Sequence, residues 1–224
     1  MSNYLAVAAV TAVLQDLIRD TVVGLGVGSP DVKVEPPKDT RSGSDRDQPA
    51  VHIYLYQTTP NPAWRNDDLP LRNGHGDRVQ RPRLALDLHY LIIFYGKDSD
   101  LVPQKLLGGV AGLLHDQAVF TQAFLQSLLD AAADDAADAT SQLLRDSRLA
   151  EQVETVTFTP VSLNLEELSK LWSILFQVPY ALSLTYTASV VFIEPDVQPV
   201  AAKPVAERHI TVQPNPDSPE ARHE

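Results

Sequence analysis

The sequence predicts an α+β fold in which a central, mostly antiparallel sheet of about four to five strands packs against three to five helices. Three observations lead to this fold class. Residues 84–95 and 182–194 alternate in polarity with the period of two that marks a strand. Residues 4–21 place apolar side chains at the spacing of an amphipathic helix. Beyond residue 194 the chain becomes rich in proline and poor in large apolar groups.

The composition limits the classes of function. The chain has 224 residues, of which 44% are hydrophobic, so it can bury the core of one large domain. Its 18 Lys and Arg against 29 Asp and Glu give a net charge of −11. That balance argues against a nucleic-acid partner, because phosphate contacts need clustered cations. The chain has no Cys for a disulfide or a thiolate site, and no run approaches the roughly 18 apolar residues of a membrane anchor.

The N-terminal helix is expected to begin after Ser2 or Asn3, either of which can cap it, and to lie across the sheet. The glycine run over 24–28 has the spacing of a dinucleotide-binding loop, but it follows a helix instead of a strand. We therefore interpret it as a helix stop. Strands are expected over 32–35 and from residue 50.

The strand over 83–95 is predicted to be central in the sheet. Its odd-numbered positions begin with Arg83, Asp87 and His89 and become apolar from Leu91 onward. Its even-numbered positions are apolar or aromatic throughout, namely Leu84, Leu86, Leu88, Tyr90, Ile92 and Phe94. Such a strand is buried on one face where it starts and on both faces where it ends.

The remaining segments continue the mixture of helices and strands. In chain order we expect a helix from about residue 100, a helix from about 121, a strand over 152–159, a helix capped by Asn164 and a strand over 182–194. Asp98 and Asp100 are expected to cap the first of these helices, and its glycines predict close packing against another backbone. The Ala- and Asp-rich stretch over 130–140 is interpreted as a solvated helix face or loop.

The change of composition divides the chain into a domain over 1–194 and a flexible, proline-rich tail over 195–224. Six of the 17 prolines lie in that tail. We interpret it as a linker or as a peptide that docks elsewhere.

The best catalytic candidate is the pair Asp87 and His89, which share one strand face, with His52 on another strand. Together these side chains could orient a general base or hold a metal. The sequence offers no third ligand, however, and a His between Leu and Tyr is usually a hydrogen-bonded structural residue. We therefore expect no enzyme activity, no cofactor and no metal.

The loop before the central strand is the candidate interaction site. Trp64 lies among charges there and is either an interface anchor or a side chain folded back on the edge of the sheet. The loop is too long to be only a connector. Its candidate contact residues are Trp64, Arg65, Asp67, Asp68, Arg72, Arg78 and Arg81.

Several long strings resemble the cap, or tail-terminator, proteins of extracellular contractile injection systems, including those of the antifeeding prophage and the Photorhabdus virulence cassettes. The most specific are AWRNDDLP at 63–70, ALDLHYL at 85–91 and EELSKLW at 166–172, which is followed by PY. The similar segments cover most of residues 2–194 in the order of the family, and the tail departs from it.

The resemblance implies a mixed α/β terminator fold and a homohexameric ring at the end of the inner tube and sheath away from the baseplate. There the ring would stop polymerisation and fix the particle's length. Inner-tube and sheath proteins would be its partners, with assembly in the bacterial cytoplasm and release outside the cell as part of the particle. Two alternatives remain open, namely a monomeric adaptor in the same particle and an enzyme that uses Asp87 and His89.

Overall fold

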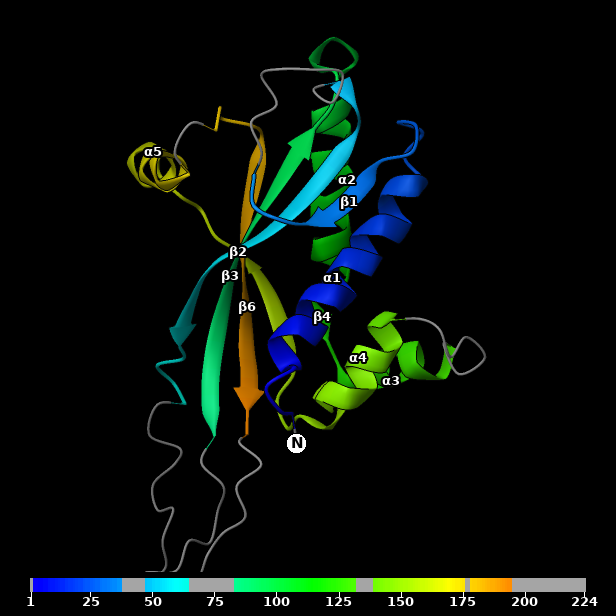
Figure 1. Cartoon of the computed structure of the whole chain (residues 1–224), viewed down its shortest axis with the longest axis vertical. Coiled ribbons are helices and arrows are strands. Elements are labelled where there is room, and N and C mark those ends of the chain that lie inside the picture. Colours follow the sequence, from blue (N-terminus) through cyan, green and yellow to red (C-terminus); the bar gives the residue numbers. More distant parts are fainter. Residues whose placement is uncertain (1, 38–46, 65–82, 132–138, 176–177, 195–224) are drawn as a thin grey trace, which may run out of the picture.

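A six-stranded sheet organises the chain, with the strand order β1-β2-β3-β6-β5-β4 (Figure 1). The computed structural model describes residues 2–37, 47–64, 83–131, 139–175 and 178–194. The strands are β1 (Asp31–Val34), β2 (Ala50–Pro60), β3 (Leu84–Tyr95), β4 (Val119–Phe120), β5 (Val156–Pro160) and β6 (Ser183–Ile193). Only the β1–β2 pair is parallel among these strands, which confirms the mostly antiparallel sheet. The sheet exceeds the expected four to five strands because β4, with two residues, is too short for a periodic signal.

The helices cover the two faces of the sheet unequally. Within the described residues they are α1 (Ala6–Val23), α2 (Val102–Asp116), α3 (Gln122–Ala131), α4 (Ala139–Ser147) and α5 (Leu165–Ile174). The first four lie on one side of the sheet, and α5 lies on the other (Figure 1). The expected α+β class is therefore confirmed, with α1 packed across the sheet.

The central strand β3 has the burial that its sequence predicts. Its even positions from Leu88 to Phe94 belong to the main core beside α1 and α2. From Leu91 onward the odd positions form a second, smaller core with Trp172 of α5. The strand is therefore buried on both faces only at its C-terminal end, where helices cover both sides.

The first helix ends as expected but begins differently. Its C-cap is Gly24, which confirms the helix stop, whereas its N-cap is Leu5 and no side chain caps it. Asn3 accepts a hydrogen bond from the Leu5 backbone N–H at 2.9 Å, one residue outside the helix. Ser2 is used elsewhere, because its hydroxyl donates to the Phe192 carbonyl at 2.6 Å.

The start of α2 also departs from the expectation. Asp98–Asp100 form a separate 3-10 turn, and the N-cap of α2 is Leu101 at a φ of 57°, without a side-chain cap. The aspartates therefore do not cap α2. Of its three glycines only Gly109 lies in a tight contact, and that contact is with the Leu25 side chain, so the expected packing of these glycines against another backbone is not found.

Strand β5 is shorter than the predicted strand because Gln152 has another role. Its side chain is 1% exposed and reaches β6, where its amide donates to the Val190 carbonyl at 2.7 Å and accepts from the Phe192 N–H at 3.0 Å. The side chain thereby replaces backbone pairing along β6. The alternation of polar and apolar residues does not predict a side-chain hydrogen bond to a distant strand.

The edge strand β1 is bonded along its length by other elements. Gln15 of α1 donates to the Val32 carbonyl at 2.8 Å, which satisfies one backbone group of this strand. The Asp31 N–H donates to the Pro49 carbonyl at 3.0 Å.

Among the described residues, no helix combines the length and apolar character that crossing a membrane requires.

Candidate interaction surface

One end of the sheet gathers chain segments that are far apart in the sequence. There β2 ends, β3 begins and β6 ends, close to the N-terminus (Figure 1). The Glu194 N–H donates to the Ser2 carbonyl at 3.0 Å, and the Asn3 N–H donates to the Ser147 carbonyl at the same distance. Residues 2 and 3 therefore bridge the end of β6 and the end of α4.

Asn61 fixes the direction of the chain after β2. Its side chain is 8% exposed, and its carbonyl accepts from the N–H groups of Ala63 and Trp64 at 2.9 and 3.2 Å. Its amide donates to Asp87 at 2.8 Å and to the Ser189 hydroxyl at 3.1 Å. The turn is thereby tied to both neighbouring strands. The sequence analysis did not single out Asn61, although the Asn-Pro dipeptide at 61–62 is a turn signal that could have located it.

Trp64 packs back onto the sheet. Its ring meets the Phe192 ring edge to face, with centroids 5.0 Å apart and planes at 86°. Ala85 and Val190 complete this small apolar cluster. This packing matches the fold-back alternative in kind, although Trp64 covers the sheet's face and not its edge. Its role as an interface anchor stays a prediction.

Arg83 also lies near the Phe192 ring. Its guanidinium carbon lies 5.8 Å from the ring centroid, and its Nε lies 3.7 Å from a carboxylate oxygen of Glu194. We call Trp64, Arg83, Phe192 and Glu194 the exit hub, because they flank residues 65–82 and precede residue 195. The other predicted contact residues, Arg65, Asp67, Asp68, Arg72, Arg78 and Arg81, lie outside the described residues.

The structure does not bring the catalytic candidates together. His89 pairs with the hydroxyls of Thr59 and Thr187 at 2.9 and 3.0 Å, while Asp87 accepts from Asn61. His52 stands opposite Ile93, four residues along β3 from His89 and hence roughly 13 Å away.

His52 has different neighbours from Asp87 and His89. It is 6% exposed and meets the Tyr95 ring at 4.7 Å and Glu35 at 3.3 Å. Its neighbours are thus different from those of Asp87 and His89, so the three side chains share no site. In the part of the chain that the structure describes, no three His, Asp or Glu side chains are placed to hold a metal.

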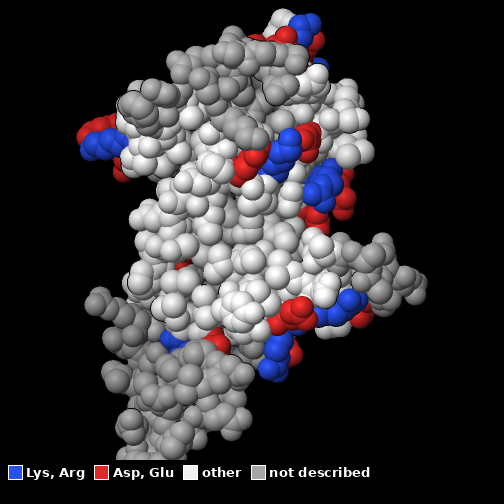
Figure 2. All heavy atoms as spheres, viewed as in Figure 1, with Lys and Arg blue, Asp and Glu red and all other residues white. Residues whose placement is uncertain are grey.

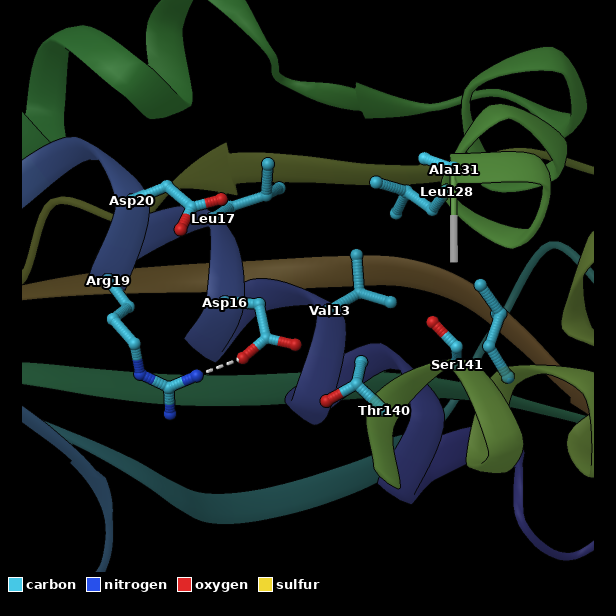
Figure 3. A pocket seen from close by; sticks show the side chains of 10 residues that line it. Val13, Asp16, Leu17, Arg19, Asp20, Leu128, Ala131, Thr140 and Ser141 are labelled. Atoms are coloured by element: carbon cyan, nitrogen blue, oxygen red, sulfur yellow. Dashed lines mark hydrogen bonds and ion pairs between the residues drawn. The ribbon is translucent and has the colours of Figure 1, made fainter. Parts of the chain in front are cut away.

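Two hollows lie away from the exit hub. One of about 400 Å³ lies between α1, α3 and α4, where Asp16 pairs with Arg19 at its rim (Figure 3). It borders Ala131, after which residues 132–138 lie outside the described part, so we assign it no ligand. The other, of about 450 Å³, runs between α5 and β2 and is lined by Tyr54, Tyr56, Gln57, Leu163, Glu167, Lys170, Leu171, Ile174 and Leu175.

In the view of Figure 2, charged side chains form small clusters above and below a middle band that is largely uncharged. The α5 helix carries one exposed pair, Lys170 with Glu166 at 2.6 Å. It also carries exposed apolar side chains, with Leu165 and Ile174 at 86% and 79% exposure. A surface of this kind is suited to protein contacts more than to small polar substrates.

A comparison with known families identifies the family of this chain. The model of the Pvc16 N-terminal domain matches residues 9–207. The chain belongs to the Pvc16 N-terminal domain family. The family match includes 13 residues beyond Glu194, the last residue of the described domain (207 minus 194). No curated protein matches the sequence.

Two solved structures are similar to this chain. The chain is similar to the sheath/tube terminator of an extracellular contractile injection system, PVC, in its extended state, with 16% identity, a TM-score of 0.50 and 96% of this chain covered. A second similar structure is the tube-terminating cap of the anti-feeding prophage, with 16% identity, a TM-score of 0.48 and 91% covered. This Pvc16 N-terminal domain spans 65% of the first chain and 60% of the second.

Proposed function

We propose that this protein is a structural cap of a contractile injection system, which ends polymerisation of the inner tube and sheath. The observation that carries the proposal is the family match over residues 9–207. The fold shared with the PVC sheath/tube terminator supports it. The hydrogen bonds of Asp87 to Asn61 and of His89 to Thr187, away from His52, are consistent with the structural role that the sequence favours for these side chains.

Capping has a simple physical requirement. A growing tube presents the same head-to-tail contact at each step, and growth continues while each added part regenerates it. A cap satisfies the last contact and offers no copy of it. In this proposal the domain assembles as a homohexameric ring in the bacterial cytoplasm, binds inner-tube and sheath subunits, and leaves the cell with the particle.

The proposed contact site is the loop that follows Trp64. Exchange of the charge sign at Arg65, Asp67 and Asp68 is expected to give tubes of uncontrolled length, because these charges would repel the partner groups that they now attract. Electron microscopy of reconstituted tubes measures the lengths. As a matched control, Lys97 and Asp100, an exposed ion pair beyond the other end of β3, are exchanged in sign together. Normal tube lengths with a normally folded loop variant would show that the loop is not part of the contact.

The deciding experiment compares particles assembled with and without this protein. The cap proposal predicts a narrow length distribution in its presence and open-ended tubes of variable length in its absence, which micrographs record directly. Equal distributions would refute it. A monomeric adaptor is distinguished by mass determination in solution, since an adaptor stays monomeric and forms no rings on isolated tubes.

A further inference from the structure

Strand β2 is paired on both sides only along its first part. β1 pairs with it from Ala50 to Ile53, whereas β3 pairs with it on the other side as far as Pro60. After β1 the chain continues with two prolines at 36–37, which have no N–H to donate to a ladder. Among the described strands, none pairs with the outer side of residues 54–60, so this half of β2 is an edge of the sheet (Figure 1).

The backbone of Thr58 faces outward at this edge. The Asn61 N–H donates to the Ala85 carbonyl of β3 at 2.9 Å. Because backbone groups alternate in direction along an antiparallel strand, Thr59 and Gln57 also face β3, and the N–H and C=O of Thr58 point away from it. The Thr58 side chain is exposed as well. These backbone groups are placed to pair with an extended chain that lies beside β2.

The edge is uncharged. Natural proteins usually protect an exposed edge strand with a charged side chain, a proline or a bulge. Residues 54–60 read YLYQTTP, which contains no charge, and the proline is the last of them. The bulge falls between Leu55 and Gln57, before Thr58. The part of the edge around Thr58 therefore carries none of these protections.

A groove of about 450 Å³ follows the same half of β2 on the side of α5. Tyr54, Tyr56 and Gln57 line it from β2, and Leu171 and Ile174 line it from α5. Ile174 is 79% exposed, so the groove leaves this apolar side chain uncovered. A strand added beside β2 would direct every second side chain to the face that carries Tyr54 and Tyr56. The aromatic and aliphatic lining suits apolar side chains at those positions.

The rim of the groove has an acidic excess. Lys170 lies on it and is paired with Glu166 at 2.6 Å. Glu167 lies on it too, and its carboxylate accepts a hydrogen bond from the Asn164 N–H, which is a neutral donor. Two carboxylates thus stand against one ammonium group on this part of α5. A basic residue in the bound segment would complement the Glu167 carboxylate.

We propose that residues 54–60 of β2 bind an extended segment of the assembly that this protein caps. The segment adds to the sheet as a further strand, places apolar side chains in the groove and sets a Lys or Arg beside Glu167. The inference rests on the proposed function for the source of the segment. A second copy fits less well, because two identical edges pair about a two-fold axis, whereas neighbours in the proposed ring meet head to tail. Main-chain hydrogen bonds supply the affinity, and the groove selects the side chains.

The first arm of the test follows amide hydrogen exchange in the full-length protein, alone and bound to isolated sheathed tubes. The Thr58 amide is expected to exchange fast in the free protein and to slow by about tenfold or more on the tubes. Slow exchange in the free protein would show that this chain or a second copy already covers the edge, which overturns the proposal. An unchanged rate in the bound protein overturns it as well.

The second arm compares matched variants by co-sedimentation with sheathed tubes. Thr58→Pro removes the outward N–H and no bond to β3, and should weaken binding by about tenfold or more, whereas Thr58→Ala keeps the N–H and should bind like the parent. Ile174→Glu should weaken binding, whereas Leu165→Glu should not, because Leu165 is an exposed residue of the same helix that does not line the groove. Where Thr58→Pro fails to fold, the two α5 variants decide. Equal binding within either folded pair overturns the proposal.

A third variant tests the charge. Glu167→Gln keeps an acceptor for the Asn164 N–H and removes the carboxylate charge, so the binding to sheathed tubes should depend less on salt. An unchanged salt dependence overturns the assigned chemistry of the segment.

Failure of this inference and failure of the cap function give different results. If the parent protein binds sheathed tubes and limits their length while Thr58→Pro behaves like Thr58→Ala, the edge is not the contact and the cap function stands. If the parent protein neither binds nor limits length, both fall, because the named partner does not bind.

Discussion

Single buried polar residues take hydrogen-bonding roles that backbone groups fill elsewhere in the domain. Gln152 completes the pairing of β6, and Ser2 satisfies the Phe192 carbonyl. In the main core the Thr11 hydroxyl donates to the Val7 carbonyl at 2.9 Å, so the Tyr90 hydroxyl donates to Thr11 at 2.8 Å. Each of these groups would cost free energy if it were buried without its partner.

Tyr90 should make stability fall at alkaline pH. Burial raises the pKa of its hydroxyl well above the ordinary value of 10.0. The unfolded chain therefore releases this proton first as the pH rises above about 10, and the folded state loses stability. Urea unfolding between about pH 8 and about pH 11 should show a shallower fall for Tyr90→Phe than for the parent. Burial also raises the pKa of Tyr56 and Tyr186, which contributes to the fall that remains. Parallel curves would contradict the assignment.

Gly96 is required where β3 ends. Its φ is +146°, and a Cβ there would lie 2.5 Å from Val102 Cγ1. Gly96→Ala should lower the free energy of unfolding by about 1 to 3 kcal/mol. Gly112 is the matched control, because it is an exposed helical glycine with nothing within 4 Å of its Cβ position. Gly112→Ala should raise the free energy by about 0.5 to 1 kcal/mol. Equal effects in denaturant unfolding would refute the distinction.

At the scale of elements, the sequence predicted those whose signals are local. The alternation in β3 and β6, the helix stop at Gly24 and the cap of α5 at Asn164 were all confirmed. Each depends on periodicity or on residues within one turn. These elements include both strands that place the exit hub.

The elements that the sequence did not predict depend on contacts distant along the chain. Strand β4 exists because it pairs with β5, and β5 begins late because Gln152 bonds to β6. The candidate site shows the same limit. Trp64 was noticed as an aromatic among charges, but its contact with Phe192 joins residues 128 positions apart (192 minus 64). No local pattern reports such a contact.

The α5 helix should depend on its capping box. Asn164 accepts from the Glu167 N–H at 2.9 Å, and the Glu167 carboxylate accepts from the Asn164 N–H at 2.9 Å. Asn164→Ala should lower the free energy of unfolding by about 1 kcal/mol. Lys170→Ala on the same helix is the control, and loss of its exposed pair with Glu166 should cost only about 0.3 kcal/mol. Chemical denaturation measures both, and an equal loss would show that the cap adds nothing specific.

At the scale of the whole molecule, the two faces of the sheet have different roles. The face beside α1 to α4 holds the main core, and the opposite face is covered by α5 at one end and by Trp64 at the other. The exits of residues 65–82 and 195–224 lie at the Trp64 end, beside the N-terminus. In the cap proposal this end faces the partner, while α5 is free to contact a neighbouring copy.

Two truncations test how much of the C-terminal segment belongs to the cap. The family match ends at residue 207, so residues 195–207 share a pattern with the family and residues 208–224 do not. We expect truncation after Glu207 to leave ring formation and sheath attachment intact. Truncation after Glu194 should reduce attachment, because the segment that starts at the exit hub would be lost. Co-sedimentation of each variant with isolated sheath measures attachment. Full attachment to the sheath after both truncations would assign the contact to residues 1–194 alone. Loss of attachment after both truncations would show that residues 208–224 also take part in the contact.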